Sequence, residues 1–236
     1  MSGDGLKKRH FMSVKVKICG LKSEAALAAA LDGGADYVGF VFYPPSPRSL
    51  LPAEAGRLAA AARSKARVVA LFVDPDDDLL DEVMTALNPD LIQLHGKETP
   101  GRVAEIRKRW ARPVMKAVSV ATQADADGAL AFADVADLLL FDAKAPPDLK
   151  DALPGGNGLT FDWRVLSGMK GRVPFMLSGG LNPQNVAEAI RLTGAQMVDV
   201  SSGVEVKPGE KDPELIRRFL AAAKQDAAKA EMTGSA

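Results

Sequence analysis

The sequence predicts a single α/β domain in which eight parallel strands close into a (β/α)8 barrel of the TIM type. Eight strand-like runs alternate with eight stretches of helical spacing over 236 residues. This alternation favours parallel strands, because each parallel pairing needs a crossover between its two strands. Four of the runs begin near residues 67, 90, 113 and 136, and such even stepping favours one βα unit repeated around a ring.

The expected elements follow one another along the chain. Ser23 is the predicted N-cap of the first helix, and Pro52, Pro183 and Pro213 stand in the first turns of later helices. The expected strands are residues 14–19, 36–42, 67–73, 90–95, 113–118, 136–142, 174–178 and 196–201. The expected helices are residues 23–32, 52–63, 76–87, 98–109, 121–131, 163–168, 183–193 and 213–226.

A weak internal repeat supports the ring. The even-numbered strands follow similar lead-ins, which read Gly34-Ala35-Asp36, Asn88-Pro89-Asp90, Val135-Ala136-Asp137 and Thr193-Gly194-Ala195. The main alternative is a doubly wound open sheet, which normally carries a G-x-G-x-x-G turn after its first strand. Here the first strand ends in Cys19-Gly20-Leu21-Lys22, which lacks that turn, so the barrel is favoured.

The composition is that of an ordinary globular protein, with 47% hydrophobic and 25% charged residues. Thirty basic residues balance 30 acidic ones, so no net field attracts nucleic acid or an anionic membrane. The start of the chain does not resemble a signal peptide, and no apolar run approaches the roughly 20 residues that span a bilayer. One cysteine excludes an internal disulfide and fits a reducing compartment. We therefore expect a cytoplasmic protein with no nucleic-acid or membrane partner.

The chain divides into three parts. We expect an N-terminal extension at residues 1–13, the barrel at residues 14–223 and a flexible tail at residues 224–236, where small and polar residues dominate. No linker composition interrupts the barrel. The Ala-rich outer helices are compatible with either a monomer or a homodimer.

Cys19 stands at the end of the first expected strand. Residues 14–19 alternate with period 2, which puts Lys15, Lys17 and Cys19 on one face. Nearby positive charge favours the thiolate form of a thiol, so Cys19 is a candidate reactive residue. The alternative is a small buried hydrophobe, the usual state of a lone cysteine.

Two neighbouring strand ends are candidate phosphate sites, because active sites of this fold lie at the carboxyl ends of the strands. Ser178-Gly179-Gly180 follows the seventh expected strand and Ser201-Ser202-Gly203 follows the eighth. Glycines let backbone N–H groups approach a phosphate closely. Gly155-Gly156, after the sixth strand, could add further donors. The alternative is that all three segments are ordinary turns.

Two aspartates are candidates for proton chemistry at the strand ends. Asp142 closes a very apolar strand, so its carboxyl group should be partly desolvated and suited to a general acid, although it could instead cap its loop. Asp199 shares its parity with Ser201 and is expected to point into the barrel. It either organises hydrogen bonds under the site or forms a structural pair with a barrel lysine.

Arg48 and His95 complete the candidate set. Three prolines stiffen the loop that holds Arg48, so its guanidinium could bind a carboxylate over the barrel mouth, the alternative being a solvated loop arginine. His95 ends the fourth strand. Because the other histidine, His10, lies in the leading segment, we expect no metal site.

Several motifs together resemble the phosphoribosylanthranilate isomerase family of tryptophan biosynthesis. The resemblance runs in order from about residue 14 to residue 220. The motifs are Val16-Lys17-Ile18-Cys19-Gly20, Ser46-Pro47-Arg48-Ser49, Gln93-Leu94-His95-Gly96, Leu139-Leu140-Phe141-Asp142, Gly155-Gly156-Asn157-Gly158, Ser178-Gly179-Gly180-Leu181 and Val198-Asp199-Val200-Ser201-Ser202-Gly203-Val204-Glu205.

The resemblance implies an Amadori rearrangement of N-(5-phosphoribosyl)anthranilate, the phosphosugar substrate, to the 1-deoxyribulose 5-phosphate. It implies that Cys19 is the general base, that Asp142 is the general acid and that Arg48 lies near the anthranilate carboxylate. His95 and Asp199 are further expected substrate contacts. The chemistry needs no organic cofactor and no metal.

The chain departs from the family pattern at two places. Asn157 stands where a threonine is usual, which puts one hydroxyl contact in doubt, and Ala143-Lys144 after Asp142 is unusual. Two other functions stay open on the residues alone. One is a different sugar-phosphate isomerase or epimerase, and the other is a noncatalytic phosphate-binding barrel.

Overall fold

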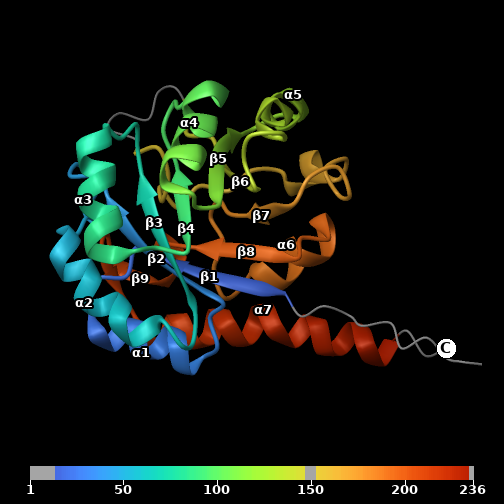
Figure 1. The fold of residues 1–236 in the computed structure, drawn as a ribbon. Coiled ribbons are helices and arrows are strands. Elements are labelled where there is room, and N and C mark those ends of the chain that lie inside the picture. Colours follow the sequence, from blue (N-terminus) through green and yellow to red (C-terminus); the bar gives the residue numbers. More distant parts are fainter. Residues whose placement is uncertain (1–13, 147–152, 234–236) are drawn as a thin grey trace, which may run out of the picture.

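The structure, a computed structural model, describes residues 14–146 and 153–233, and it confirms the predicted barrel (Figure 1). Eight strands hydrogen-bond in sequence order and close into a ring. They are β1 (Lys15–Cys19), β2 (Tyr37–Phe42), β3 (Arg67–Phe72), β4 (Leu91–Leu94), β5 (Val114–Val120), β6 (Leu138–Ala143), β7 (Phe175–Leu177) and β8 (Met197–Val200). The expected extension at residues 1–13 lies outside the described residues.

The first and last strands close the ring. Every neighbouring pair of strands is parallel, including the closing pair of β1 and β8. In this register Lys17 lies opposite Tyr37 of β2 on one side and opposite Asp199 of β8 on the other. Closure therefore brings together an ammonium and a carboxylate that are far apart in the sequence.

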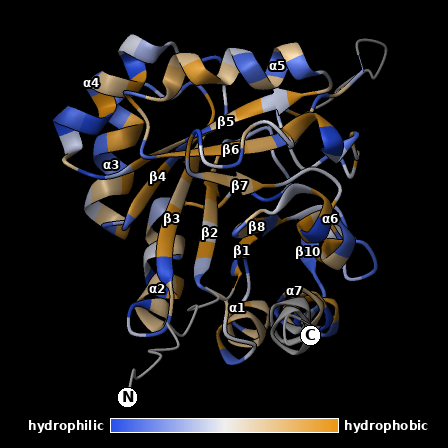
Figure 2. Cartoon of the chain, turned by 90° about the vertical axis from the view of Figure 1, so that its right-hand side faces the viewer, coloured by the Kyte–Doolittle hydropathy of each residue, from blue (hydrophilic) through white to orange (hydrophobic). Residues whose placement is uncertain are grey.

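Helices surround the ring, and Figure 2 shows the apolar strands enclosed by them. Ser23 caps α1 as predicted, because its Oγ accepts a hydrogen bond from the Ala26 N–H at 3.3 Å. The α-helices are α1 (Glu24–Asp32), α2 (Pro52–Ala62), α3 (Asp77–Leu87), α4 (Pro100–Trp110), α5 (Gln123–Gly128), α6 (Val186–Thr193) and α7 (Pro213–Thr233). The last of these lies beside α1 (Figure 1).

Some connections differ from the sequence expectation. The segment expected to form one helix at residues 121–131 holds α5 followed by the 3-10 helix η1 (Ala129–Phe132). Between β6 and β7, the described residues 144–146 and 153–174 contain one short helix, the 3-10 helix η2 (Trp163–Leu166). Helix α7 continues to Thr233, past the expected boundary of the barrel domain at residue 223.

The connection after β8 holds two elements that the sequence did not suggest. The 3-10 helix η3 (Ser202–Val204) leads into a short antiparallel hairpin of β9 (Glu205–Lys207) and β10 (Glu210–Lys211). The alternating pattern is too short here to indicate a strand. This hairpin carries two charged side chains of the site described below.

The internal repeat has a physical basis at the amino-terminal end of the barrel. Asp36, Asp90 and Asp137 each precede an even-numbered strand, and each accepts a hydrogen bond from the start of the preceding odd-numbered strand. The donors are the N–H groups of Val16, Val68 and Val114, at 2.9, 2.7 and 2.9 Å. The repeated aspartate therefore fastens pairs of strands at the end of the barrel away from the site.

Apolar side chains fill two spaces. The larger core lies between the strands and the helices and includes Phe40, Phe72 and Phe219. A second cluster takes inward-facing residues from six of the strands, namely Tyr37, Val69, Leu91, Met115, Ala117, Leu138, Leu140 and Met176. Toward the carboxyl ends of the strands, Cys19, Val41 and Leu71 form a separate small cluster that lines a cavity.

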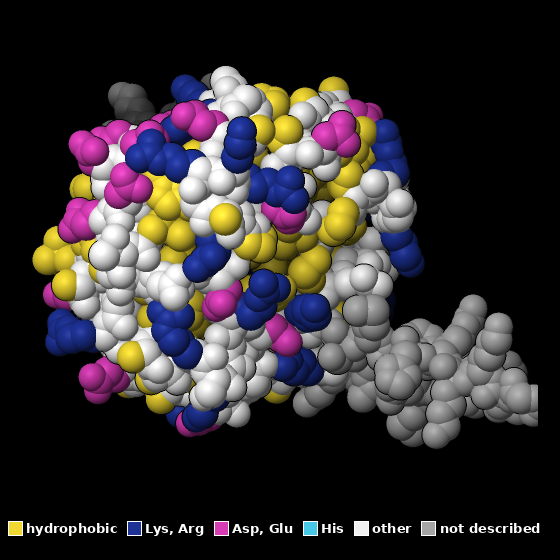
Figure 3. Space-filling model, in the orientation of Figure 1, with side chains coloured by type: hydrophobic (Ala, Val, Ile, Leu, Met, Phe, Trp, Pro, Cys, Tyr) yellow, Lys and Arg dark blue, Asp and Glu magenta, His cyan; other side chains and the backbone are white. Residues whose placement is uncertain are grey.

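The outer surface mixes both signs of charge. Figure 3 shows Lys and Arg side chains interspersed with Asp and Glu over one face of the molecule. Within residues 14–146 and 153–233, no helix has the length and apolar character that crossing a membrane requires.

Candidate active site

A cavity opens at the carboxyl ends of the strands, where the active sites of this fold lie, and its empty space is about 740 Å³ with open solvent included. All but one of the residues predicted for the site line it: Cys19, Arg48, His95, Asp142, Gly155, Gly156, Ser178, Gly179, Gly180, Asp199 and Ser202. The exception is Gly203, whose Cα packs against the Leu181 carbonyl instead.

Cys19 ends β1 and is only 4% exposed. Burial raises the pKa of its thiol above the ordinary value, and the positive charges of Lys17 and Lys211 only partly offset that effect. The sequence expectation that neighbouring lysines favour the thiolate is therefore right in direction but outweighed by desolvation. The raised pKa favours the neutral thiol over the thiolate.

Lys17 lies two residues deeper on the same face and is completely buried. Its Nζ is 2.8 Å from Oδ1 of Asp199, and the Ser178 hydroxyl donates to the other oxygen of that carboxylate at 3.1 Å. Burial lowers the pKa of Lys17, but Asp199 and Cys19 more than offset this, so the pKa is raised overall. Both predictions for Asp199 are compatible with this arrangement, since the residue pairs with a lysine and also lines the cavity.

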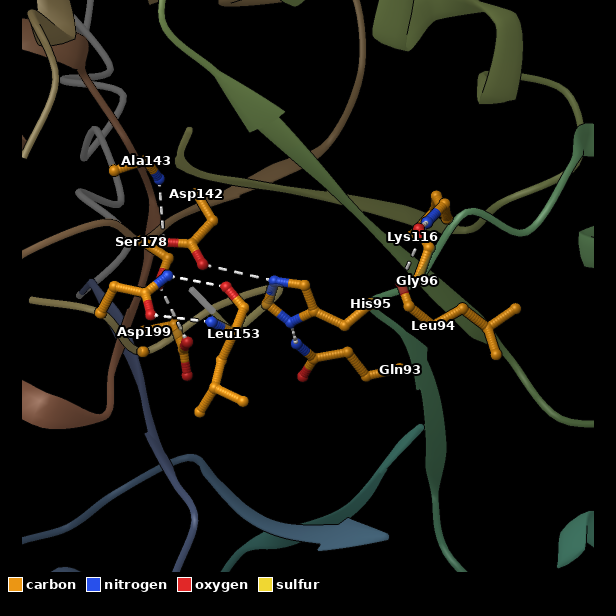
Figure 4. Close-up of polar contacts among 12 residues, drawn as sticks. Gln93, Leu94, His95, Gly96, Lys116, Asp142, Ala143, Leu153, Ser178 and Asp199 are labelled. Atoms are coloured by element: carbon orange, nitrogen blue, oxygen red, sulfur yellow. Dashed lines mark hydrogen bonds and ion pairs between the residues drawn. The ribbon is translucent and has the colours of Figure 1, made fainter. Parts of the chain in front are cut away.

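Asp142 lies in β6 and is 6% exposed. Its Oδ1 accepts a hydrogen bond from the Ala143 N–H at 2.9 Å, and its Oδ2 is 3.3 Å from Nε2 of His95 (Figure 4). The imidazole and the carboxyl group are close without being aligned as a hydrogen bond. A Cβ added at Gly155 would lie 2.6 Å from Oδ2 of Asp142, so this glycine covers the carboxyl group closely.

Arg48 is 5% exposed and therefore is not a solvated loop arginine. Its Nε and Nη2 bind the two carboxylate oxygens of Glu205, each at 2.8 Å, and Nη2 also donates to the Gly156 carbonyl at 3.1 Å. Lys211 binds the same carboxylate. The Glu205 pKa is lowered, because Arg48 and Lys211 outweigh the effect of its burial.

Three residues of this site were not predicted as functional: Glu205, Lys211 and Gln93. Glu205 lies in β9 and Lys211 in β10. These strands have three and two residues, which is too few for an alternating pattern that would mark a buried side chain. Gln93 did carry a signal, because it shares its parity with the inward-facing Leu91 of β4. A polar residue at an inward position near a strand end is a candidate for the site.

The glycines of the last loops are required by close packing. Gly179 and Gly180 have φ values of 87° and 62°, which a side chain would strain. A Cβ at Gly180 would lie 2.6 Å from the Leu159 carbonyl, and one at Gly203 would lie 1.9 Å from the Leu181 carbonyl. The loops after β6, β7 and β8 are therefore pressed together around one end of the cavity.

The two departures from the family pattern have local explanations. The Asn157 amide accepts from the Leu153 N–H at 3.1 Å and donates to the Leu153 carbonyl at 2.7 Å, so it holds its own loop. Lys144 leaves the cavity and pairs with Asp125 at 2.8 Å. Among the described residues, no three His, Cys, Asp or Glu side chains gather as a metal-binding group.

The sequence model of the N-(5'-phosphoribosyl)anthranilate isomerase family matches residues 16–222. The chain belongs to this family. The isomerase of Paracoccus denitrificans is 57% identical over 90% of this chain and 98% of its own length, and that of Parvibaculum lavamentivorans is 54% identical over 91% and 100%. The family also confirms the expected enzyme class, an isomerase of tryptophan biosynthesis.

Solved structures agree with this assignment. The phosphoribosylanthranilate isomerase of Thermotoga maritima is 36% identical, covers 90% of this chain and 99% of its own length, and superimposes with a TM-score of 0.80. Another isomerase structure contains reduced 1-(o-carboxyphenylamino)-1-deoxyribulose 5-phosphate; it is 34% identical over 90% of this chain and 99% of its own, with a TM-score of 0.78.

Proposed function

We propose that Cys19 and Asp142 perform the Amadori rearrangement of N-(5-phosphoribosyl)anthranilate as general base and general acid. The observation that supports this is their shared cavity. Cys19 ends β1 and Asp142 lies in β6, strands that are not neighbours in the ring, yet both side chains line the same space. A single pentose can therefore lie between them.

Asp142 and Cys19 move the protons of the first two steps. Asp142 donates a proton to the furanose ring oxygen as the C1–O bond breaks, and the nitrogen lone pair forms the Schiff base. Cys19, as thiolate, removes the proton at C2, and the electrons of that bond return to the nitrogen. The enolamine then tautomerises to the aminoketone. A group of this kind commonly contributes about 10²–10⁴-fold to the rate.

Lys17 supplies the charge that favours the reactive form of Cys19. Burial favours the neutral thiol, whereas removal of a carbon-bound proton needs the thiolate, so Cys19 must ionise before it can act. The buried ammonium of Lys17, held by Asp199, lowers the cost of that ionisation. Asp199 then acts through Lys17, in addition to its predicted contact with substrate.

Arg48 binds the anthranilate carboxylate from the edge of the cavity. Glu205 and Gly156 engage Nε and Nη2, so among the described contacts Nη1 is the nitrogen left for a ligand. Together Arg48, Lys211 and Glu205 bring two positive charges and one negative charge to this place. The remaining positive charge complements an anionic aromatic group.

The phosphate binds the loops after β7 and β8 through Ser178, Gly179, Gly180, Ser202 and Gly203. The support is the close packing of these loops, the positive φ values of Gly179 and Gly180, and the place of all these residues but Gly203 in the cavity lining. Gly155 and Gly156 were predicted to bind phosphate as well. The contacts they make here are with Asp142 and Arg48, which supports a role in closing the cavity beside the acid and the arginine.

The cellular setting stays a prediction. We keep the cytoplasmic location, the start of the domain at residue 14 and the monomeric or homodimeric state as parts of the proposal. Of the predicted tail at residues 224–236, residues 224–233 continue α7, and residues 234–236 lie outside the described residues. One relative, the isomerase of Thermotoga maritima, is described as dimeric. Sedimentation of this chain alone would decide between the two states.

The test is turnover with the proposed substrate, followed through the loss of anthranilate-type fluorescence. Cys19→Ala and Asp142→Asn should each lower kcat by about 10²-fold or more with the melting temperature retained. Near-normal turnover in either variant would contradict the assignment. A folded wild type that binds inorganic phosphate but does not turn over would favour the noncatalytic barrel.

A further inference from the structure

Gln93 is a buried amide at the floor of the active site that the mechanism above does not use. It lies in β4, is 1% exposed and lines the cavity together with His95 and Asp142. Its Nε2 is 3.2 Å from Nδ1 of His95, while its Oε1 is buried without a partner in the part of the chain that the structure describes. Figure 4 shows Gln93, His95 and Asp142 in a line.

The amide decides which nitrogen of His95 carries the proton. An amide nitrogen is a donor only, so Nδ1 of His95 must present its lone pair to Gln93. In a neutral imidazole the proton then lies on Nε2, the atom 3.3 Å from Oδ2 of Asp142. The reversed amide would leave two N–H groups without acceptors, whereas the present one leaves one N–H and one carbonyl oxygen unpaired, and a buried N–H without a partner is rarer than such an oxygen.

The same contact leaves no acceptor for a proton on Nδ1. A proton there would place an N–H of the ring against the N–H of Gln93. A charged His95 would form an ion pair with Asp142 and hold it as a carboxylate, which has no proton to give. A neutral His95 instead offers one N–H that can stabilise the carboxylate formed after Asp142 has donated its proton.

The other charged groups around His95 are engaged elsewhere. Lys116 of β5 binds the carboxylate of Glu98 at 2.8 Å, and that carboxylate also accepts from the Gly96 N–H. Asp74, which follows β3, accepts from the Lys97 N–H at 2.6 Å. Across the cavity, Lys17 and Arg48 are held by Asp199 and Glu205. Within residues 14–146 and 153–233, Asp142 is therefore the ionisable group that lies against the ring.

We propose that Gln93 is a positioning residue that holds His95 as the neutral Nε2–H tautomer, so that Asp142 can serve as a general acid. The side chain of Gln93 lines the cavity, and its buried Oε1 has no donor among the described residues. The inference rests on the proposed role of Asp142. It assigns a task to an amide that makes no proton transfer itself.

The first test reads the tautomer directly and does not depend on activity. The chain has two histidines, so His10→Gln leaves a single ring whose ¹⁵N NMR signals belong to His95. Near neutral pH we expect a protonated Nε2 and an unprotonated Nδ1. Gln93→Glu should convert this pattern to that of an imidazolium, because a carboxylate accepts from Nδ1–H. A protonated Nδ1 in the wild-type ring would overturn the proposal.

The second test measures kcat and KM separately. Gln93→Glu should lower kcat by about 10–100-fold, the range seen when the outer hydrogen-bond partner of a functional histidine is lost at metal sites. KM should change little, and Gln93→Asn, which keeps an amide, should lie between this variant and the wild type. Gln123→Glu makes the same chemical change at an exposed position of α5 and should leave kcat unchanged.

The two proposals fail in different ways. Normal turnover in Asp142→Asn would remove the proposed function, whatever the state of His95. An imidazolium signal in Gln93→Glu together with an unchanged kcat would refute only the role of Gln93. A fall in kcat with no change in the ¹⁵N pattern would also refute it, since the amide would then act by another route.

Discussion

The two sides of the cavity differ in the kind of group that surrounds the reactive side chain. Around Cys19 the neighbours are charged and paired: Lys17 with Asp199, and Lys211 and Arg48 with Glu205. Around Asp142 the neighbours are the imidazole of His95, the backbone N–H of Ala143 and the Cα of Gly155. Ion pairs thus lie beside the proposed base, whereas neutral dipoles lie beside the proposed acid.

The difference follows from what each group must do. A thiol in an apolar pocket needs positive charge nearby before it can ionise. A carboxylic acid must keep its proton until the substrate arrives, and a cation beside it would remove that proton. One barrel end can hold both groups because Cys19 lies in β1 and Asp142 in β6, which are not neighbours in the ring.

The largest effect is expected from adding a fixed charge to the neutral side. His95→Lys places an ammonium beside Asp142 and should hold it as a carboxylate, which would lower kcat by about 10²-fold or more, as loss of the acid would. The matched variant is His95→Asn, which stays neutral and should cost far less. Equal kcat values for the two variants would show that the charge next to Asp142 does not matter.

Removing charge from the other side gives the next largest effect. Lys17→Met leaves the Asp199 carboxylate buried without its partner, which should cost about 3–5 kcal/mol of unfolding free energy. It should also raise the pKa of Cys19 further, because a lowering influence is lost while Asp199 keeps its raising one. The pH–rate profile of Lys17→Met reports this shift, and an unchanged profile would exclude the proposed role of Lys17.

A double variant separates stability from tuning. Lys17→Met with Asp199→Asn removes both charges, so most of the unfolding free energy should return. The Cys19 pKa should remain above that of the wild type, because burial still acts on the thiol and no ammonium from Lys17 offsets it. Chemical denaturation and the pH–rate profile measure the two quantities.

Alkylation of Cys19 tests the same pKa in the free protein. The chain has one cysteine, so iodoacetamide reports a single site. Because burial raises the pKa of this thiol, the alkylation rate should keep rising with pH beyond about 8.5, where an unburied thiol is half ionised. A rate that levels off below that pH would mean that the lysines outweigh desolvation.

The far end of the barrel provides the contrast for all of these variants. Asp90→Ala removes the carboxylate that accepts from the Val68 N–H at 2.7 Å and should cost about 1–3 kcal/mol of unfolding free energy. The change lies far from the carboxyl ends of the strands, so kcat and KM should be unchanged. Altered kinetics here would show that the two ends of the barrel are coupled.

The smallest effect is expected at a helix cap. Ser23→Ala removes the side chain that accepts from the Ala26 N–H and should cost about 1 kcal/mol of unfolding free energy. Thermal unfolding of the variant measures this loss. Ser23→Gly should retain more stability than Ser23→Ala, because glycine is tolerated better at an N-cap.

The sequence predicted those features that leave a regular pattern. Buried parallel strands leave apolar runs, and the aspartates before the even-numbered strands leave a spaced repeat, so the order and approximate bounds of the ring could be read directly. Cys19, Asp142 and the glycine loops were found because they end such runs. The 3-10 helix η2 was expected as a longer helix, since a single turn has too few residues to show a period.

The features that were missed depend on contacts between distant parts of the chain. Glu205 belongs to the site because the fold places its carboxylate against Arg48. Lys211 belongs to it because the hairpin of β9 and β10 places its ammonium against the same carboxylate. Glu98 was expected to begin a helix, but its carboxylate binds Lys116 and α4 begins at Pro100. Local sequence carries no sign of such partners.

The most direct test is a crystal structure of this chain with a reduced analogue of the rearranged product. We predict that Sγ of Cys19 and a carboxyl oxygen of Asp142 both contact the pentose portion, from opposite sides. We also predict that Nη1 of Arg48 binds the carboxylate of the aromatic ring. An analogue bound with either the thiol or the carboxyl group out of reach of the sugar would contradict the proposed mechanism.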